Sequence, residues 1–177
     1  MDHERERMGM VAEAVSWFRT PYRDCQRLKG CGVDCAQYPA AAYHAAGLVE
    51  EIPHFPYSPQ WHINQREEKY LKVVLSYARE IAPPGCATWP DDLVGPRGVL
   101  GDEVVDALIK AGTYAPLPGD LVLYKVGHCH AHGAIVIAWP RIIHAVKGEG
   151  VKYGQGLEEP FHKDRLADRL PRFFTVF

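Results

Sequence analysis

The stretch GVDCAQYPAAAYHAAG, residues 32–47, holds the feature that decides the fold: a cysteine at the expected start of a helix. Small, mostly apolar residues run from 36 to 46, which predicts a buried helix closed by Gly47. Cys35 stands at its N-terminus, where unpaired N–H groups and the positive end of the helix dipole favour a thiolate. Cys35 is thus a candidate nucleophile, and a buried structural cysteine is the alternative.

The residues beside Cys35 bear on how this helix begins. Asp34 is placed to cap the helix with its carboxylate. Pro39 lacks an N–H, so we expect it to cost the helix an early hydrogen bond.

Helices are expected first along the chain and strands second. Apolar residues at helical spacing predict helices over 8–18, 36–46, 67–81 and 102–111. Alternating or β-branched runs predict strands over 120–126, 133–139, 141–146 and 173–177, the last at an edge of the sheet. This order predicts an α+β domain in which N-terminal helices pack on a C-terminal antiparallel sheet.

Composition excludes several classes of protein. The 177 residues, 47% of them hydrophobic, suffice for one domain with its own core. The net charge is −2 and no basic block is present, which argues against nucleic-acid binding. No run approaches the ~18 apolar residues of a membrane span. The charged start MDHERERMGM does not resemble a signal peptide, so we expect synthesis in the cytoplasm without one.

Cysteine usage is informative because the number is odd. The five cysteines are Cys25, Cys31, Cys35, Cys86 and Cys129. An odd, scattered set is a poor disulfide framework and points to a reducing compartment. Structural thiols, metal ligands and a nucleophile stay open as explanations.

A histidine-rich run, His128-Cys129-His130-Ala131-His132, is the second candidate site. In an extended chain its three imidazoles would share a face and could bind zinc. Alternatively His132 alone acts as a general base, or the run is only a polar turn. The base is favoured because it requires one correctly placed histidine, so no metal or other cofactor is expected.

His144 interrupts an apolar strand and is the third candidate. If residues 133–139 and 141–146 form a hairpin, His144 can lie beside His132. It could then orient that imidazole, as the third member of a nucleophile–base–orienter set does. A core histidine with a satisfied hydrogen bond is the alternative.

Five blocks in this order resemble the NlpC family of papain-like cysteine peptidases, and especially forms found in phage and phage-derived tail modules. The blocks are Thr20–Arg23, Gly32–Cys35, Pro118–Val122, His132–Val136 and Ile143–Ala145. The resemblance implies a single papain-like domain over 1–177, with an insertion at about 48–116 between the nucleophile helix and the sheet. Loops over 53–61 and 83–101 are expected to border the cleft.

The resemblance also implies a function. Family members cleave the stem peptides of bacterial peptidoglycan without a cofactor. By position Cys35 matches the nucleophile, His132 the base and His144 the third polar residue. Tyr22 and Asp34 match residues that hold the free amino end of the substrate, and the block 118–120 is a structural turn.

The resemblance also implies a place of action, and three other functions stay open. The expected place is the cell wall, reached in a virion or tail-like particle, with tail proteins as possible partners. An amidase or acyltransferase would use the same three residues. A metal-dependent hydrolase would use the histidine run, and a non-catalytic tail protein would use none of them.

Overall fold

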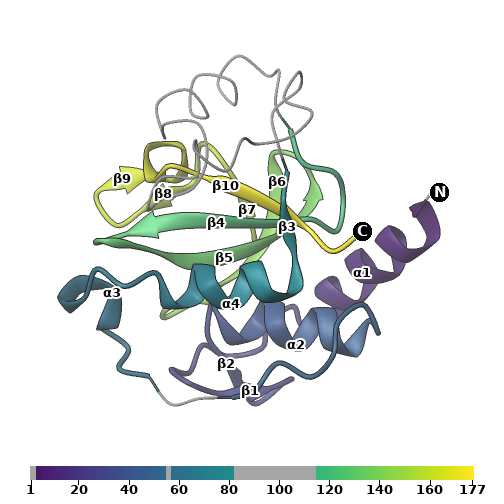
Figure 1. The fold of residues 1–177 in the computed structure, drawn as a ribbon, viewed down its shortest axis with the longest axis horizontal. Coiled ribbons are helices and arrows are strands. Elements are labelled where there is room, and N and C mark those ends of the chain that lie inside the picture. Colours follow the sequence, from purple (N-terminus) through teal and green to yellow (C-terminus); the bar gives the residue numbers. More distant parts are fainter. Residues whose placement is uncertain (1–2, 55–56, 82–114) are drawn as a thin grey trace.

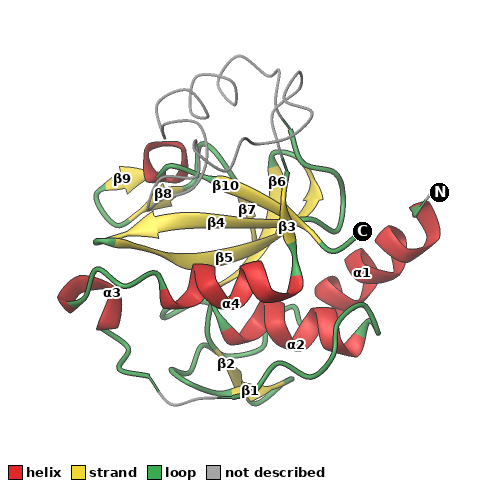
Figure 2. Cartoon of the chain, in the orientation of Figure 1, coloured by secondary structure: helices red, strands yellow, loops and turns green. Residues whose placement is uncertain are grey.

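The computed structural model describes residues 3–54, 57–81 and 115–177, and they form a sheet covered by helices on one face (Figures 1 and 2). The helices are α1 Glu4–Ser16, α2 Gln37–Ala45, α3 Trp61–Asn64 and α4 Lys69–Tyr77, with a 3-10 turn η1 at Leu166–Arg169. The expected loop over 83–101 and helix over 102–111 lie outside the described residues.

The main sheet has six antiparallel strands in the order β3-β10-β4-β5-β6-β7. Its strands are β3 Arg79–Glu80, β4 Leu121–Val126, β5 Cys129–Ala138, β6 Arg141–Val146, β7 Gly150–Gln155 and β10 Arg172–Thr175. Two small hairpins pair β1 Arg27–Leu28 with β2 Gly32–Val33, and β8 Pro160–Phe161 with β9 Asp164–Arg165. The predicted α+β class with an antiparallel sheet is confirmed.

Two expectations about individual elements are wrong. The last strand is not an edge, because β10 lies between β3 and β4. The helix expected over 67–81 ends at Tyr77, since the chain turns into extended structure at Ala78 and forms β3. Tyr70 and Val74 of this helix are buried as its apolar spacing predicts, whereas Leu75 is exposed.

Each face of the sheet has its own core. On the helix-covered face, Leu121, Ile135 and Phe174 pack with residues of α1, α2 and α4. On the opposite face, Val122, Val136 and Phe173 belong to a second cluster, against which the partly buried Phe161 of β8 packs. The alternation of buried residues along β4 and β5 divides their side chains between these two cores.

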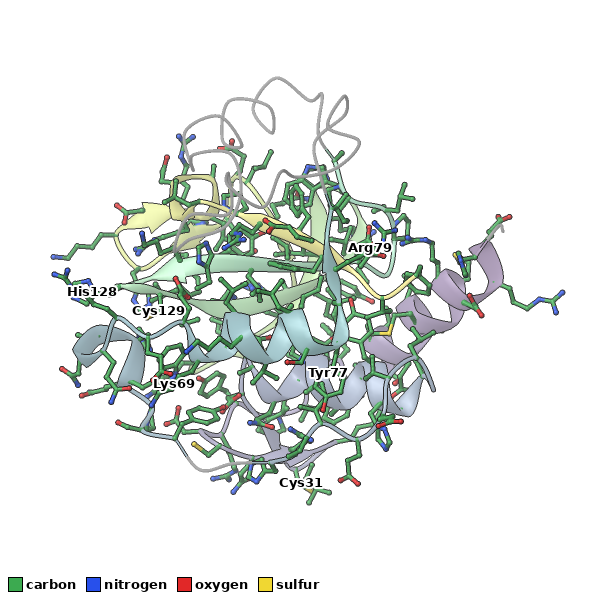
Figure 3. The ribbon with its side chains drawn as sticks, in the orientation of Figure 1. Cys31, Lys69, Tyr77, Arg79, His128 and Cys129 are labelled. Carbon is green, nitrogen blue, oxygen red and sulfur yellow. The ribbon has the colours of Figure 1, made fainter. Side chains whose placement is uncertain are left out.

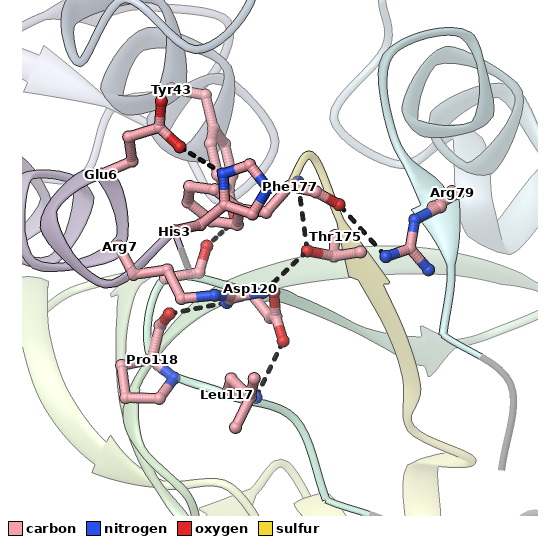
Figure 4. A network of polar contacts seen from close by, with 11 residues as sticks. His3, Glu6, Arg7, Tyr43, Arg79, Leu117, Pro118, Asp120, Thr175 and Phe177 are labelled. Carbon is pink, nitrogen blue, oxygen red and sulfur yellow. Dashed lines mark hydrogen bonds and ion pairs between the residues drawn. The ribbon is translucent and has the colours of Figure 1, made fainter. Parts of the chain in front are cut away.

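A buried ion pair fixes α1 to the start of β4 (Figure 4). The Arg7 guanidinium donates to Asp120 Oδ1 at 2.8 Å, to the Pro118 carbonyl at 2.9 Å and to the Thr175 hydroxyl at 3.3 Å. The other Asp120 oxygen accepts the Leu117 N–H at 2.8 Å. These contacts support the expected structural role of the Pro-Gly-Asp turn. No helix among the described residues has the length and apolarity of a membrane span.

Candidate functional site

Asp34 caps the start of the helix that follows Cys35, as its position in the sequence predicts. Its Oδ1 accepts the N–H groups of Ala36 at 3.0 Å and Gln37 at 2.8 Å. The helical hydrogen bonds begin one residue before Pro39, because the Tyr38 N–H donates to the Asp34 carbonyl at 2.9 Å. Pro39 has no N–H for the equivalent bond to the Cys35 carbonyl, which is the early loss that the sequence predicts.

The Cys35 side chain reaches the backbone of β5 on both sides of His132. Its Sγ donates to the Ala131 carbonyl at 3.5 Å, and the Gly133 N–H faces the sulfur. A Cβ at Gly133 would lie 2.3 Å from the Tyr70 hydroxyl and 3.1 Å from the Cys35 carbonyl. Glycine at this position therefore leaves room for the Cys35 backbone and the Tyr70 side chain against β5.

The environment of Cys35 holds it as a neutral thiol. Burial and the nearby Asp34 carboxylate raise the pKa of Cys35 to about 12, although the Tyr22 hydroxyl and the Gly133 N–H oppose the shift. The prediction that the helix N-terminus keeps Cys35 as a thiolate is therefore wrong. Desolvation and a like charge outweigh the helix dipole here.

His132 and His144 form a direct pair on neighbouring strands. His132 Nε2 lies 2.9 Å from His144 Nδ1, and both rings are almost completely buried. Their side chains share one face because Ala134, two residues after His132, pairs with His144. The predicted hairpin thus brings the two histidines together.

His132 keeps one ring nitrogen available for proton transfer. Burial, and next the neighbouring His144, lower the pKa of His132 well below its usual value, so the ring is neutral near pH 7. Its Nδ1 has no hydrogen-bonding partner among the described residues, Cys35 Sγ included. Such contacts are often long without substrate.

Glu159 extends the histidine pair and could not be identified from the sequence. Its Oε1 lies 3.4 Å from His144 Nε2 and 2.9 Å from Lys152 Nζ. The contact with His144 is longer than an ordinary hydrogen bond, and His144 Nε2 has no closer acceptor in the described ranges. Burial alone would raise the pKa of Glu159, but His144 and Lys152 lower it to about 2, so the side chain is ionised.

Comparison with known proteins identifies the architecture that holds this cysteine and these histidines. No family model and no curated protein match the sequence. Among solved structures, the NlpC/p60 domain of the peptidoglycan hydrolase SagA matches with a TM-score of 0.50 and 19% sequence identity. The match covers 95% of this chain and 96% of that one.

The fold is that of an NlpC/p60 domain.

Within this NlpC/p60 fold, the two residues expected to bind substrate lie beside Cys35. The Tyr22 hydroxyl faces the Cys35 sulfur, and burial is the first cause of its raised pKa. The buried Asp34 uses its second oxygen, Oδ2, to accept the Cys25 N–H at 2.7 Å and the Tyr57 hydroxyl at 2.5 Å. Both oxygens of the Asp34 carboxylate thus already have donors. Tyr57 is one of these donors, and the sequence alone did not indicate this contact.

An apolar pocket lies next to the start of α2. It has a volume of about 470 Å³ and lies between α2, α4 and residues 49–53 and 57–61, with Tyr57 and Trp61 in its lining. Cys35 and His132 are not among its lining residues. The described residues of the 53–61 stretch, among them Pro53 and Ser58, therefore border this pocket, and residues 55–56 lie outside the described ranges. The buried Tyr70 also lines it, and its hydroxyl has no hydrogen-bond partner among the described residues.

The histidine run does not converge as a metal site would require. His128 is exposed in the turn at the end of the sheet (Figure 3). The His130 ring lies 3.2 Å from Glu68 Oε1 and 3.3 Å from the Leu170 carbonyl. The three imidazoles were expected to share a face because side chains alternate along a strand. A bulge opposite Tyr124 and Lys125 interrupts that alternation. No metal-like group of three ligands occurs in residues 3–54, 57–81 and 115–177.

The described cysteines are unpaired thiols. Cys31 is exposed, Cys25 and Cys35 are half-buried, and Cys129 is buried. The Cys129 thiol donates to the carbonyls of Gln65 and Glu67, both at 3.3 Å. Cys129 therefore has a structural role, whereas Cys35 is the thiol beside the histidine pair.

Proposed function

We propose that this protein is a cysteine peptidase that hydrolyses peptide bonds in the stem peptides of bacterial peptidoglycan. The observation that carries the proposal is the contact of Cys35 with the β5 backbone on both sides of His132, which itself pairs with His144. The NlpC/p60 fold supports the substrate class, because the structural neighbour is a domain of a peptidoglycan hydrolase.

The proposed reaction is nucleophilic acyl transfer. His132 Nδ1 takes the proton of the Cys35 thiol while the sulfur attacks the scissile carbonyl, which forms a tetrahedral oxyanion. When that intermediate collapses, the C–N bond breaks and His132 returns the proton to the leaving amine. Water activated by His132 then cleaves the thioester, which releases the acid and restores the thiol.

Neutral partners suit this first step. Since Cys35 is a thiol and His132 an unprotonated imidazole, the proton moves as the carbon–sulfur bond forms. To donate its proton to His132, the Cys35 thiol must first release its hydrogen bond to the Ala131 carbonyl. N–H groups near the start of α2 are the candidates for stabilising the oxyanion.

Substrate binding is assigned to Tyr22 and Asp34. The buried Asp34 has no cationic side chain within ion-pair distance in the described ranges, and its negative charge would attract the free amino group of a stem peptide. Tyr22, beside the sulfur, would contact the residue next to the scissile bond. Action in a phage tail or a tail-like particle is part of the proposal and rests on the sequence resemblance.

The test is hydrolysis of defined stem peptides by the purified chain. We expect Cys35→Ala and His132→Ala each to abolish product formation, while Cys31→Ala, an exposed thiol four residues away, leaves it unchanged. Circular dichroism establishes that each variant is folded. A folded Cys35→Ala protein with full activity would overturn the proposal, and amides or esters offered in parallel separate a peptidase from other acyl transfer.

A further inference from the structure

We propose that Glu159 is a positioning residue that fixes the tautomers of His144 and His132, so that Nδ1 is the unprotonated nitrogen of His132. The proposal rests on the proposed function, since it explains how His132 is prepared to act as a base. It concerns a residue in the connection between β7 and β8, away from all five sequence blocks that resemble the NlpC family.

An ionised carboxylate can only accept hydrogen bonds. Glu159 Oε1 is the acceptor beside His144 Nε2, at 3.4 Å, so it favours the proton on that nitrogen. A neutral His144 with its proton on Nε2 has a lone pair on Nδ1.

The tautomer of His144 determines the tautomer of His132, because the two rings share a hydrogen bond. His144 Nδ1, as an acceptor, requires His132 Nε2 to donate across the 2.9 Å contact. A neutral His132 with its proton on Nε2 has a bare Nδ1, which is the form a general base needs. When His132 becomes protonated in the reaction, the same acceptor and the distant carboxylate stabilise the imidazolium.

Two donors hold the Glu159 carboxylate in place. The Gln155 N–H donates to Oε2 at 2.9 Å, and Lys152 Nζ contacts Oε1 at 2.9 Å. A Cβ at Gly154 would lie 2.0 Å from Glu159 Oε2 and 2.7 Å from His144 Nε2. Glycine at 154 therefore leaves the space through which the carboxylate reaches the imidazole.

The other groups around the two histidines cannot fix their tautomers in the same way. The Tyr124 hydroxyl donates to the Gly156 carbonyl, and the Phe161 ring, 4.5 Å from the His132 ring, is apolar. His162 is exposed, and it acts on His132 through its charge, lowering the pKa. Glu159 is the only carboxylate of the described chain that contacts this histidine pair.

The first experiment reads the tautomers directly and needs no substrate. Ring ¹⁵N chemical shifts of His132 and His144 are measured in the full chain, in Glu159→Gln and in the matched control Glu158→Gln, whose carboxylate is exposed and pairs with Arg165. We expect protonated Nε2 on both rings in the parent and in Glu158→Gln, and mixed tautomers in Glu159→Gln. Unchanged ring shifts in Glu159→Gln would overturn the proposal.

The second experiment uses stem-peptide hydrolysis. We expect Glu159→Gln to lower kcat by about 10- to 1,000-fold with KM little changed, since the base and not the binding site is affected. Glu158→Gln should match the parent. Equal kcat in Glu159→Gln and the parent would also overturn the role of Glu159. An inactive parent chain would contradict the proposed function instead. The tautomer measurement would still test the role of Glu159, because it needs no substrate.

Discussion

His132 Nε2 and His144 Nδ1 lie 2.9 Å apart, on adjacent antiparallel strands, and both rings are almost completely buried. One of these nitrogens must donate and the other accept, so the pair has a defined direction. The nitrogen of His132 that stays open is Nδ1, and Cys35 contacts the backbone immediately before and after that residue.

Replacing His144 with leucine should reduce catalysis and stability together. The substitution removes the acceptor and leaves the Nε2–H group of His132 buried without a partner, which costs about 1–3 kcal/mol. We expect kcat to fall by at least about 100-fold, because the base loses its orientation. His128→Leu is the matched control, since His128 is exposed in a turn. Equal loss in both variants, measured by hydrolysis and urea unfolding, would contradict the specific role of His144.

Alkylation of Cys35 should be slow at pH 8. Burial and Asp34 raise the pKa of Cys35 to about 12, so little thiolate is present there. In a timed reaction with iodoacetamide, mapped by mass spectrometry, the exposed Cys31 should react before Cys35. Asp34→Asn removes the charge that opposes ionisation and should accelerate the labelling of Cys35. Faster labelling of Cys35 than of Cys31 in the parent would show that the thiolate is stabilised after all.

The sequence predicted the parts of the site that depend on local pattern. The spacing of His132 and His144 around a tight turn implied adjacent strands, and the hairpin brings the two rings together. Asp34 one residue before Cys35 implied a helix cap, and the cap is present. Both conclusions follow from short-range geometry, in which period and turn leave little freedom.

Contacts between distant segments could not be predicted in this way. Glu159 reaches His144 because Gly154 has no side chain, and neither residue belongs to a recognisable pattern. The pKa of Cys35 depends on how deeply α2 packs against β5, which a single sequence does not specify. Likewise β10 joins the interior of the sheet because β3 follows α4, and the apolar run of β10 could equally have formed an edge.

Replacing Arg7 with leucine should destabilise the fold without touching the site. Asp120 has a side-chain exposure of 1%, and Arg7 is its ion-pair partner. Removing one member of a buried pair leaves an uncompensated charge, which costs about 3–5 kcal/mol. Arg5→Leu is the control, because Arg5 is exposed on the same helix. The free energy of unfolding in urea should fall for Arg7→Leu alone, and an unchanged value would show that the pair contributes nothing.

The acid stability of the protein should depend on Glu159. The pKa of this carboxyl is lowered from 4.5 to about 2, so the folded state binds its proton less readily than the unfolded chain does. Its contribution is therefore complete above pH 4.5 and disappears as the pH falls from 4.5 toward 2. Because the side chain is partly solvated, we expect a contribution on the order of 1 kcal/mol.

Glu159→Gln isolates this contribution from other acid effects. The lowered pKa of His132 also makes the folded protein less stable below pH 6.5, because the unfolded chain takes up the proton more readily. This effect is present in both the parent and Glu159→Gln. Thermal unfolding from pH 6 to pH 2 should give curves that differ at pH 6 and converge toward pH 2. Glu158→Gln should follow the parent at every pH. A constant difference between Glu159→Gln and the parent would mean that Glu159 acts through packing and not through its charge on His144.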